Sequence, residues 1–168
     1  MGDYADISPC GRYRYRLDRK FIGAGPTVVF CMLNPSTADA ENNDPTIRRC
    51  IGFARREGAG KLVVVNLFAG RATKPDELFK MDDPTGPRNE HAWESALDGR
   101  NEIIIAAWGA DKRAKRAGDR FRAWARMWGR ELYCLGKTQA GAPRHPLYLK
   151  NDAARELYGR SLQEQPHD

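Results

Sequence analysis

The sequence lacks any apolar run near the roughly 20 residues that a membrane-spanning helix needs. Its opening residues, MGDYAD, have no basic start followed by an apolar stretch, which is the pattern of a secretory signal. We therefore expect a cytoplasmic protein that does not act at a membrane.

Cysteine is also scarce, and the 4 cysteines in 168 residues contain no Cys-x-x-Cys pair. This spacing excludes a zinc ribbon, a thioredoxin-type motif and a disulfide scaffold. His91 and Glu94 lie one helical turn apart, but two ligands without a third make a poor metal site. We therefore expect neither a metal nor a cofactor.

Two familiar catalytic motifs are missing as well. Gly136-Lys137-Thr138 resembles the end of a P-loop, but Glu131 stands where that motif requires its first glycine. The chain has no Gly-x-Ser-x-Gly nucleophile turn. These absences exclude P-loop nucleotide hydrolysis and serine-based acyl transfer.

The composition is that of one folded domain, which we expect to span residues 1–168. Hydrophobic residues make up 41% and charged residues 30% of the chain, so a buried core is expected. The 28 Lys and Arg exceed the 22 Asp and Glu, giving a formal net charge of +6. This excess is compatible with an anionic partner but does not establish one.

Short apolar runs alternate with helical periodicity along the chain, which is typical of an α/β domain. The apolar runs predict four strands, at 27–33, 62–68, 103–108 and 131–135. Periodicity predicts helices at 44–58, 89–97 and 111–128, and a last helix from Asn151 onward. We therefore expect a three-layer α/β/α fold around a central, mainly parallel, four-stranded sheet.

Both ends of the chain and one helix leave alternatives open. Residues 1–25 are predicted to form an N-terminal arm, in which tyrosines alternate with arginines. An antiparallel edge strand or hairpin needs fewer assumptions there than base stacking does. Solvated charge likewise explains the basic face of 111–128 more simply than phosphate binding does. A polar tail is predicted from about residue 161.

Polar residues follow the predicted strands where α/β proteins place their sites. Asn34 follows the first strand and Asn66 lies inside the second, while His145 comes after the fourth. A buried amide without a partner costs about 1–3 kcal/mol, so Asn66 needs a reason to be there. Each amide alone is explained by helix capping or by a bond to a neighbouring loop. Their gathering with His145 at one sheet edge favours a functional site.

The order of these motifs resembles the uracil-DNA glycosylase superfamily, closest to its mismatch-specific uracil/thymine branch. The resemblance rests on Leu33-Asn34-Pro35, on Asn66-Leu67 with a following Arg71-Ala72-Thr73, on Trp108-Gly109 and on His145-Pro146. More narrowly, LNPSTAD, DPTIRR, NLFAGRAT and PRHPLYL resemble an uncharacterised bacterial and phage family of unknown function. The first resemblance implies a glycosylase-like fold.

The resemblance to the glycosylases also implies residue roles. Asn34 would orient the attacking water, and His145 would donate a hydrogen bond to the leaving base. Asn66 would read the flipped base, with Pro35 and Ser36 beside it. Asp44 is expected to cap its helix, and a carboxylate there could also assist water activation.

The remaining implied contacts are to DNA. Arg71, Lys137 and Arg144 would contact phosphates, and Leu147 would wedge into the duplex. The chain departs from the superfamily at Leu147, where Pro-Leu replaces Pro-Ser, and no stacking aromatic is evident in 44–53.

These residues predict a monomeric DNA glycosylase that hydrolyses the N-glycosidic bond of a flipped, damaged or modified base. Two alternatives remain open at this point. One is a non-catalytic module of the same fold that binds nucleic acid or a nucleobase. The other is a hydrolase that acts on free nucleosides or nucleotides.

Overall fold

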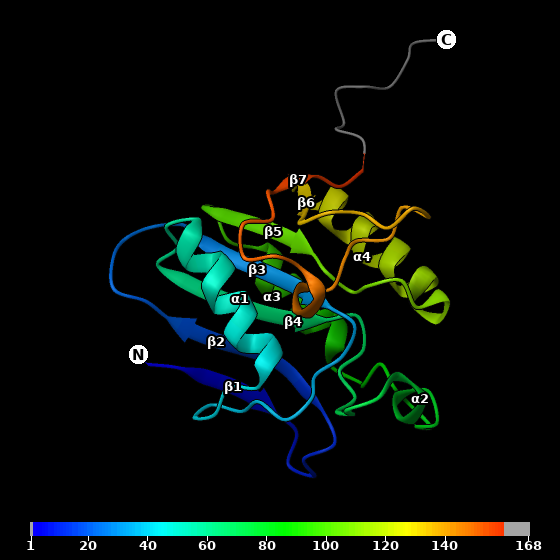
Figure 1. Ribbon diagram of the computed structural model, residues 1–168. Helices are drawn as coiled ribbons and strands as arrows, with labels where there is room; N and C mark the ends of the chain where they lie inside the picture. The colour runs from blue at the N-terminus through cyan, green and yellow to red at the C-terminus, as the bar shows by residue number, and fades with distance from the viewer. Residues whose placement is uncertain (1, 160–168) are drawn as a thin grey trace.

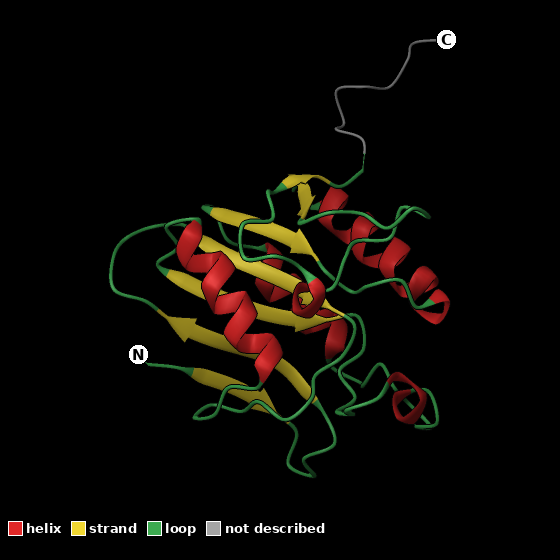
Figure 2. Ribbon diagram, in the orientation of Figure 1, coloured by secondary structure: helices red, strands yellow, loops and turns green. Residues whose placement is uncertain are grey.

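The computed structural model describes residues 2–159 and contains a mixed sheet with helices on both faces (Figures 1 and 2). The sheet has seven strands in the order β1-β2-β4-β3-β5-β6-β7. In chain order they are β1 (Tyr4–Ile7), β2 (Arg14–Lys20), β3 (Thr27–Met32), β4 (Lys61–Asn66), β5 (Glu102–Ala106), β6 (Leu132–Cys134) and β7 (Glu156–Leu157). The helices are α1 (Pro45–Arg56), α2 (Pro75–Leu78), α3 (Asn89–Leu97) and α4 (Lys115–Met127), with the short turns η1 (Lys112–Ala114) and η2 (Pro146–Tyr148).

The α/β class predicted from the sequence is confirmed, but the predicted number of four strands is wrong. The four expected strands are β3 to β6, and they pair in parallel in the order β4-β3-β5-β6. Three antiparallel strands extend this core, because β1 and β2 add to β4 at one edge and β7 adds to β6 at the other. These strands are charged or very short, so they lack the apolar runs that reveal a buried strand.

The helix predicted from Asn151 is wrong. In its place β7 pairs with β6, and the Tyr158 N–H donates to the Leu132 carbonyl. The Tyr158 ring meets Trp108 edge to face at 5.7 Å between centroids. These pairings outweigh a weak helical pattern. The polar tail predicted from about 161 lies outside the described residues.

Each face of the sheet carries its own apolar core. On one face, Ile47, Cys50, Phe53 and Ala54 of α1 pack against alternate residues of β3, β4 and β5. On the other face, residues of α3 and α4 pack around the buried Trp93. Figure 1 shows α1 on the near side of the sheet and α3 and α4 on the opposite side.

The topology opens a crevice at the carboxyl ends of β3 and β5. These two strands are parallel neighbours, and the chain leaves β3 toward α1 and β5 toward α4, which cover opposite faces. Ligands of open α/β sheets bind where such connections diverge.

Candidate functional site

A cavity of about 510 Å³ occupies this crevice, and we call it the strand-end cavity. Its volume lies within the range of about 300–1,000 Å³ that is usual for small-molecule sites. It is lined by residues after β3, at the start of α1, after β5 and around η2. The polar and aromatic side chains among them are Arg14, Asn34, Ser36, Thr37, Asp44, Thr46, Thr73, Trp108, Asp111, His145 and Tyr148.

The amide group of Asn34 is fixed by three carbonyls. Its Nδ2 donates to Pro35 at 3.0 Å, to Gly70 at 3.3 Å and to Ala72 at 2.9 Å. Because Nδ2 is held by the backbone, Oδ1 is the end of the amide that is free to accept a hydrogen bond. Asn34 therefore brings an oriented acceptor to the strand-end cavity.

The His145 ring is held as a neutral donor. Its Nδ1 accepts the Leu147 N–H at 3.2 Å, which caps η2. Burial lowers the pKa of His145 from its ordinary 6.5, and the negative charge of Asp44 opposes this change only in part. With Nδ1 accepting, the proton of the neutral ring lies on Nε2. The remaining edge of the ring is therefore a donor.

Asp44 caps α1, as the sequence predicts. Its Oδ1 accepts the Ile47 N–H at 2.8 Å, and its Oδ2 accepts the Ala38 N–H at 3.4 Å. Pro45 follows in the first helical position, where its missing N–H costs nothing. The same carboxylate lines the strand-end cavity beside His145. Capping and a role in the cavity are thus compatible.

The cap can be separated from the charge by substitution. Asp44→Ala should lower the free energy of unfolding by about 1 kcal/mol, because the Ile47 N–H loses its acceptor. Asp44→Asn should stay within a few tenths of a kcal/mol, since asparagine is an equally good cap. Urea unfolding followed by circular dichroism measures both. Equal losses in the two variants would show that the charge, not the cap, stabilises the fold.

Two buried side chains, one in the wall of the strand-end cavity and one behind it, have polar atoms without hydrogen-bond partners. Arg14 and Asn66 are each 1% exposed. Neither Nδ2 nor Oδ1 of Asn66 has a hydrogen-bond partner, and neither does Nε of Arg14. Asn66 does not line the cavity, although it pairs in register with Met32, which does. Buried polar atoms without partners destabilise the fold, so packing alone does not explain why these two residues lie here.

Aromatic side chains line the cavity, although the sequence shows no evident stacking aromatic in 44–53. Trp108 is 5% exposed and lies in the wall, whereas Tyr148 is 83% exposed at the rim. The Tyr148 ring lies 5.9 Å from the His145 ring between centroids. Tyr148 ends the short turn η2, and no local pattern in the sequence marks it as a site residue.

The structure brings together five of the residues singled out from the sequence. These are Asn34, Ser36, Asp44, His145 and Leu147. The others do not line the strand-end cavity: Pro35, Asn66, Arg71, Lys137 and Arg144.

Among these others, Arg71 has a local structural partner. Its Nε donates to the Ser36 carbonyl at 3.3 Å, and its Nη1 donates to the Gly11 carbonyl at 3.4 Å. The side chain therefore holds the segment after β3 in place. Lys137 and Arg144 are exposed on the turn that follows β6. Their predicted phosphate contacts stay predictions.

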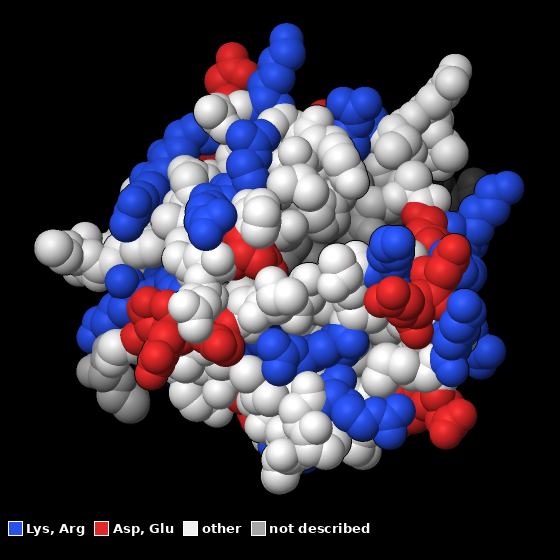
Figure 3. Space-filling model, turned by 60° about the horizontal axis from the view of Figure 1, so that its bottom comes forward, with Lys and Arg blue, Asp and Glu red and all other residues white. Residues whose placement is uncertain are grey.

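The basic face predicted for 111–128, which spans η1 and α4, is paired in part. Arg113 bridges Asp111 and Asp76, Lys115 pairs with Asp119, and Arg120 pairs with Glu90. Figure 3 brings forward the part of the molecule at the bottom of Figure 1, away from α4, and there too Lys and Arg side chains are interspersed with Asp and Glu. This pairing favours the simpler interpretation of solvated charge.

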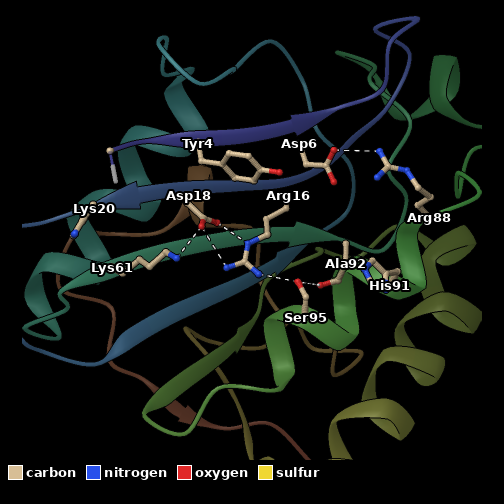
Figure 4. Close-up of a pocket in the computed structure, with 11 residues that line it drawn as sticks. Tyr4, Asp6, Arg16, Asp18, Lys20, Lys61, Arg88, His91, Ala92 and Ser95 are labelled. Carbon is tan, nitrogen blue, oxygen red and sulfur yellow. Dashed lines mark hydrogen bonds and ion pairs between the residues drawn. The ribbon is translucent and has the colours of Figure 1, made fainter.

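A second cavity, of about 590 Å³, lies between α3 and strands β1, β2 and β4. Its charged groups mostly satisfy one another (Figure 4). Asp18 pairs with Arg16 and with Lys61, each at 2.8 Å, and Asp6 pairs with Arg88 at 3.1 Å. Although it is larger, this cavity offers fewer free polar groups than the strand-end cavity does.

Residues 2–159 contain no group of three His, Cys, Asp or Glu side chains placed to hold a metal ion. Over the same range, no helix has the length and apolar character that a bilayer crossing requires.

The neutral state of His145 has a consequence for stability. Because its folded pKa lies below 6.5, the unfolded chain binds a proton there first as the pH falls. The stability that the neutral ring contributes is therefore fully present above pH 6.5, and it is lost as the pH falls from 6.5 toward the pKa of the folded state. Urea midpoints between about pH 7 and about pH 5 should fall less in His145→Gln than in the native protein. Urea midpoints that fall equally with pH in both proteins would contradict a buried neutral ring.

Comparison with known proteins gives one family and no closer relative. A family model described as "Protein of unknown function (DUF1643)" matches residues 14–147. The search of curated proteins finds no match, and neither does the search of solved structures.

Proposed function

The chain belongs to the DUF1643 family, and we propose that this member hydrolyses the N-glycosidic bond of a damaged or modified base in DNA. Membership confirms the resemblance to an uncharacterised family. The wider resemblance to uracil-DNA glycosylases, and with it a glycosylase-like fold, stays a prediction that no comparison supports. The proposal therefore rests on the chemistry of the strand-end cavity.

One observation carries the proposal: a residue with a fixed acceptor and a residue with a neutral donor line the same cavity. Asn34 has its Nδ2 tied to three carbonyls and its Oδ1 free. His145 has its Nδ1 tied to Leu147 and its Nε2 as a donor. Both residues line the strand-end cavity. Hydrolysis of a glycosidic bond needs these two functions, one for the water and one for the leaving group.

The reaction follows from these positions. The Asn34 Oδ1 accepts a hydrogen bond from a water and directs its oxygen toward the sugar carbon C1′. As the C1′–N bond breaks, its electron pair leaves with the base, and His145 Nε2–H donates to the base oxygen where negative charge grows. Water then bonds to C1′ and loses a proton to solvent, and the base takes a proton from solvent. Asp44 stabilises the positive charge that develops on the sugar.

A base must leave the duplex to reach this cavity, because the reacting side chains lie inside it. Leu147 is 39% exposed and Tyr148 is 83% exposed at the rim, where a flipped nucleotide would enter. An apolar side chain can fill the space that a flipped base leaves, and an exposed ring can stack on a neighbouring base. We expect a monomer to suffice, since one chain supplies all of these groups.

The proposal is tested by a screen for released base. Oligonucleotides carrying uracil, hypoxanthine, hydroxymethyluracil or modified bases are incubated with the protein, single-stranded and double-stranded, and free base is measured by mass spectrometry. Release of at least one base is expected. Binding that survives both Asn34→Ala and His145→Ala without any release would favour a non-catalytic module. Release only from free nucleosides or nucleotides would favour the small-molecule hydrolase.

A further inference from the structure

Arg14 is a cation enclosed at the wall of the strand-end cavity without a carboxylate partner. The residue is 1% exposed. Its Nη1 donates to the Ala38 carbonyl at 3.0 Å, whereas its Nε has no acceptor. No ion pair within 4.0 Å involves it among the described residues, although it lines the cavity. A buried charge without a partner is costly unless a ligand supplies one.

The surroundings of Arg14 keep it charged and available. Burial lowers its pKa to about 10, and the charge of Asp44 opposes that change. Arg14 therefore stays a cation at neutral pH. Asp44 does not pair with it directly, because no ion pair within 4.0 Å joins these two residues.

The local fold explains how an arginine comes to face this cavity from a sheet. The pairing of β1 with β2 shifts register between Asp6 and Ile7, which face Arg16 and Arg14 in turn. Tyr15 is therefore an extra residue, and such a bulge turns neighbouring side chains to a new direction. Arg16 faces α3, where it donates to Ser95, whereas Arg14 faces the loop between β3 and α1, where it donates to the Ala38 carbonyl.

We propose that Arg14 binds the anionic edge of the departing base and is a catalytic residue of the strand-end cavity. This inference rests on the proposed function. Nη1 is occupied by the Ala38 carbonyl and Nε is enclosed, so Nη2 is the donor left to reach the cavity that Arg14 lines. A charged N–H donor there can bind the oxygen of a lactam base, where negative charge gathers after its C1′–N bond has broken.

A fixed cation at this place acts on the transition state more than on the bound substrate. The base is neutral while it is joined to the sugar and becomes an anion as the bond breaks. Arg14 is oriented beforehand by its bond to Ala38, so no reorganisation is needed when the charge appears. His145 offers one neutral donor to the same group, and Arg14 adds the full positive charge.

The test compares an anionic ring with a neutral ring of similar shape, independently of catalysis. Sodium barbiturate, a planar lactam anion at neutral pH, and uracil, its neutral counterpart, are titrated into the full-length protein by calorimetry. The native protein should bind barbiturate about ten-fold more tightly than uracil. Arg14→Gln should bind the two rings equally, because glutamine keeps donors but no charge. Arg14→Lys should keep part of the preference.

The outcomes separate this inference from the proposed function. Equal binding of the two rings by the native protein, or no binding of either, overturns the role of Arg14 even if base release is observed. A preference that survives in Arg14→Gln overturns it as well, since the anion would then lie elsewhere. A preference for barbiturate with no base release from any substrate keeps the anion site and refutes the glycosylase. If Arg14→Gln fails to fold, the test rests on the barbiturate preference of the native protein and on its partial retention in Arg14→Lys.

Discussion

His145→Ala should slow base release by about 100-fold or more at saturating substrate. The loss is expected in the rate of the chemical step, because the Nε2–H bond strengthens only as charge grows on the leaving base. The ring is already positioned by the Leu147 N–H and kept neutral by burial, so no reorganisation of the side chain is needed during the reaction. Single-turnover release of free base measures the effect.

A matched variant separates the donor from the shape of the turn. In His145→Asn the side-chain oxygen can accept the Leu147 N–H, so the turn is kept, but the amide nitrogen takes the place of ring Cδ2 and does not reach the position of Nε2. This variant should therefore lose about as much activity as His145→Ala, while its free energy of unfolding stays close to that of the native protein. Equal activities of His145→Ala and the native protein would remove the ring from the mechanism.

Trp93→Ala should lower the free energy of unfolding by about 3–5 kcal/mol. The side chain is 1% exposed and meets Phe121 edge to face at 5.3 Å between centroids. Its Nε1 also donates to the Asn66 carbonyl at 2.8 Å, at the end of β4. The substitution therefore removes core volume and a buried hydrogen bond together.

Trp93→Phe isolates the hydrogen bond, because it keeps an aromatic ring and loses the N–H. A loss of about 1–3 kcal/mol is expected, which is smaller than that of Trp93→Ala. The Asn89 Nδ2 donates to the same carbonyl at 3.0 Å, so this carbonyl keeps a hydrogen bond and the loss of stability is smaller. Urea midpoints with unchanged slopes would report stability alone. A loss below about 1 kcal/mol in Trp93→Ala would contradict its place at the centre of this core.

The parallel centre of the fold was predictable because strands buried on both faces have continuous apolar sequences. β3 and β4 are almost wholly buried and read as TVVFCM and KLVVVN. The outer strands were not predictable in number, because β2 reads RYRLDRK and satisfies its charges through ion pairs such as Arg16–Asp18. A two-residue strand such as β7 depends on tertiary pairing with β6, which no local pattern shows.

The candidate site was predictable where the chain turns at a strand end. Asn34 comes just after β3 and His145 lies in the loop that follows β6, and the parallel pairing carries the ends of both strands to one edge of the sheet. Arg14 was missed as a site residue because its direction depends on the bulge at Tyr15, which the alternation of arginine and tyrosine conceals. Asn66 was expected inside a strand at 62–68, whereas it is the last residue of β4; its burial beside Met32 depends on packing across the sheet.

The central claim is that the strand-end cavity breaks a C1′–N bond. The most direct measurement counts free base and abasic sites together in one reaction of the native protein with the modified-base oligonucleotides. The account predicts the two products in equal amounts from at least one substrate, and neither product from Asn34→Ala at the same protein concentration. Intact strands and no free base from every substrate, with protein shown to be folded by its melting transition, would contradict it.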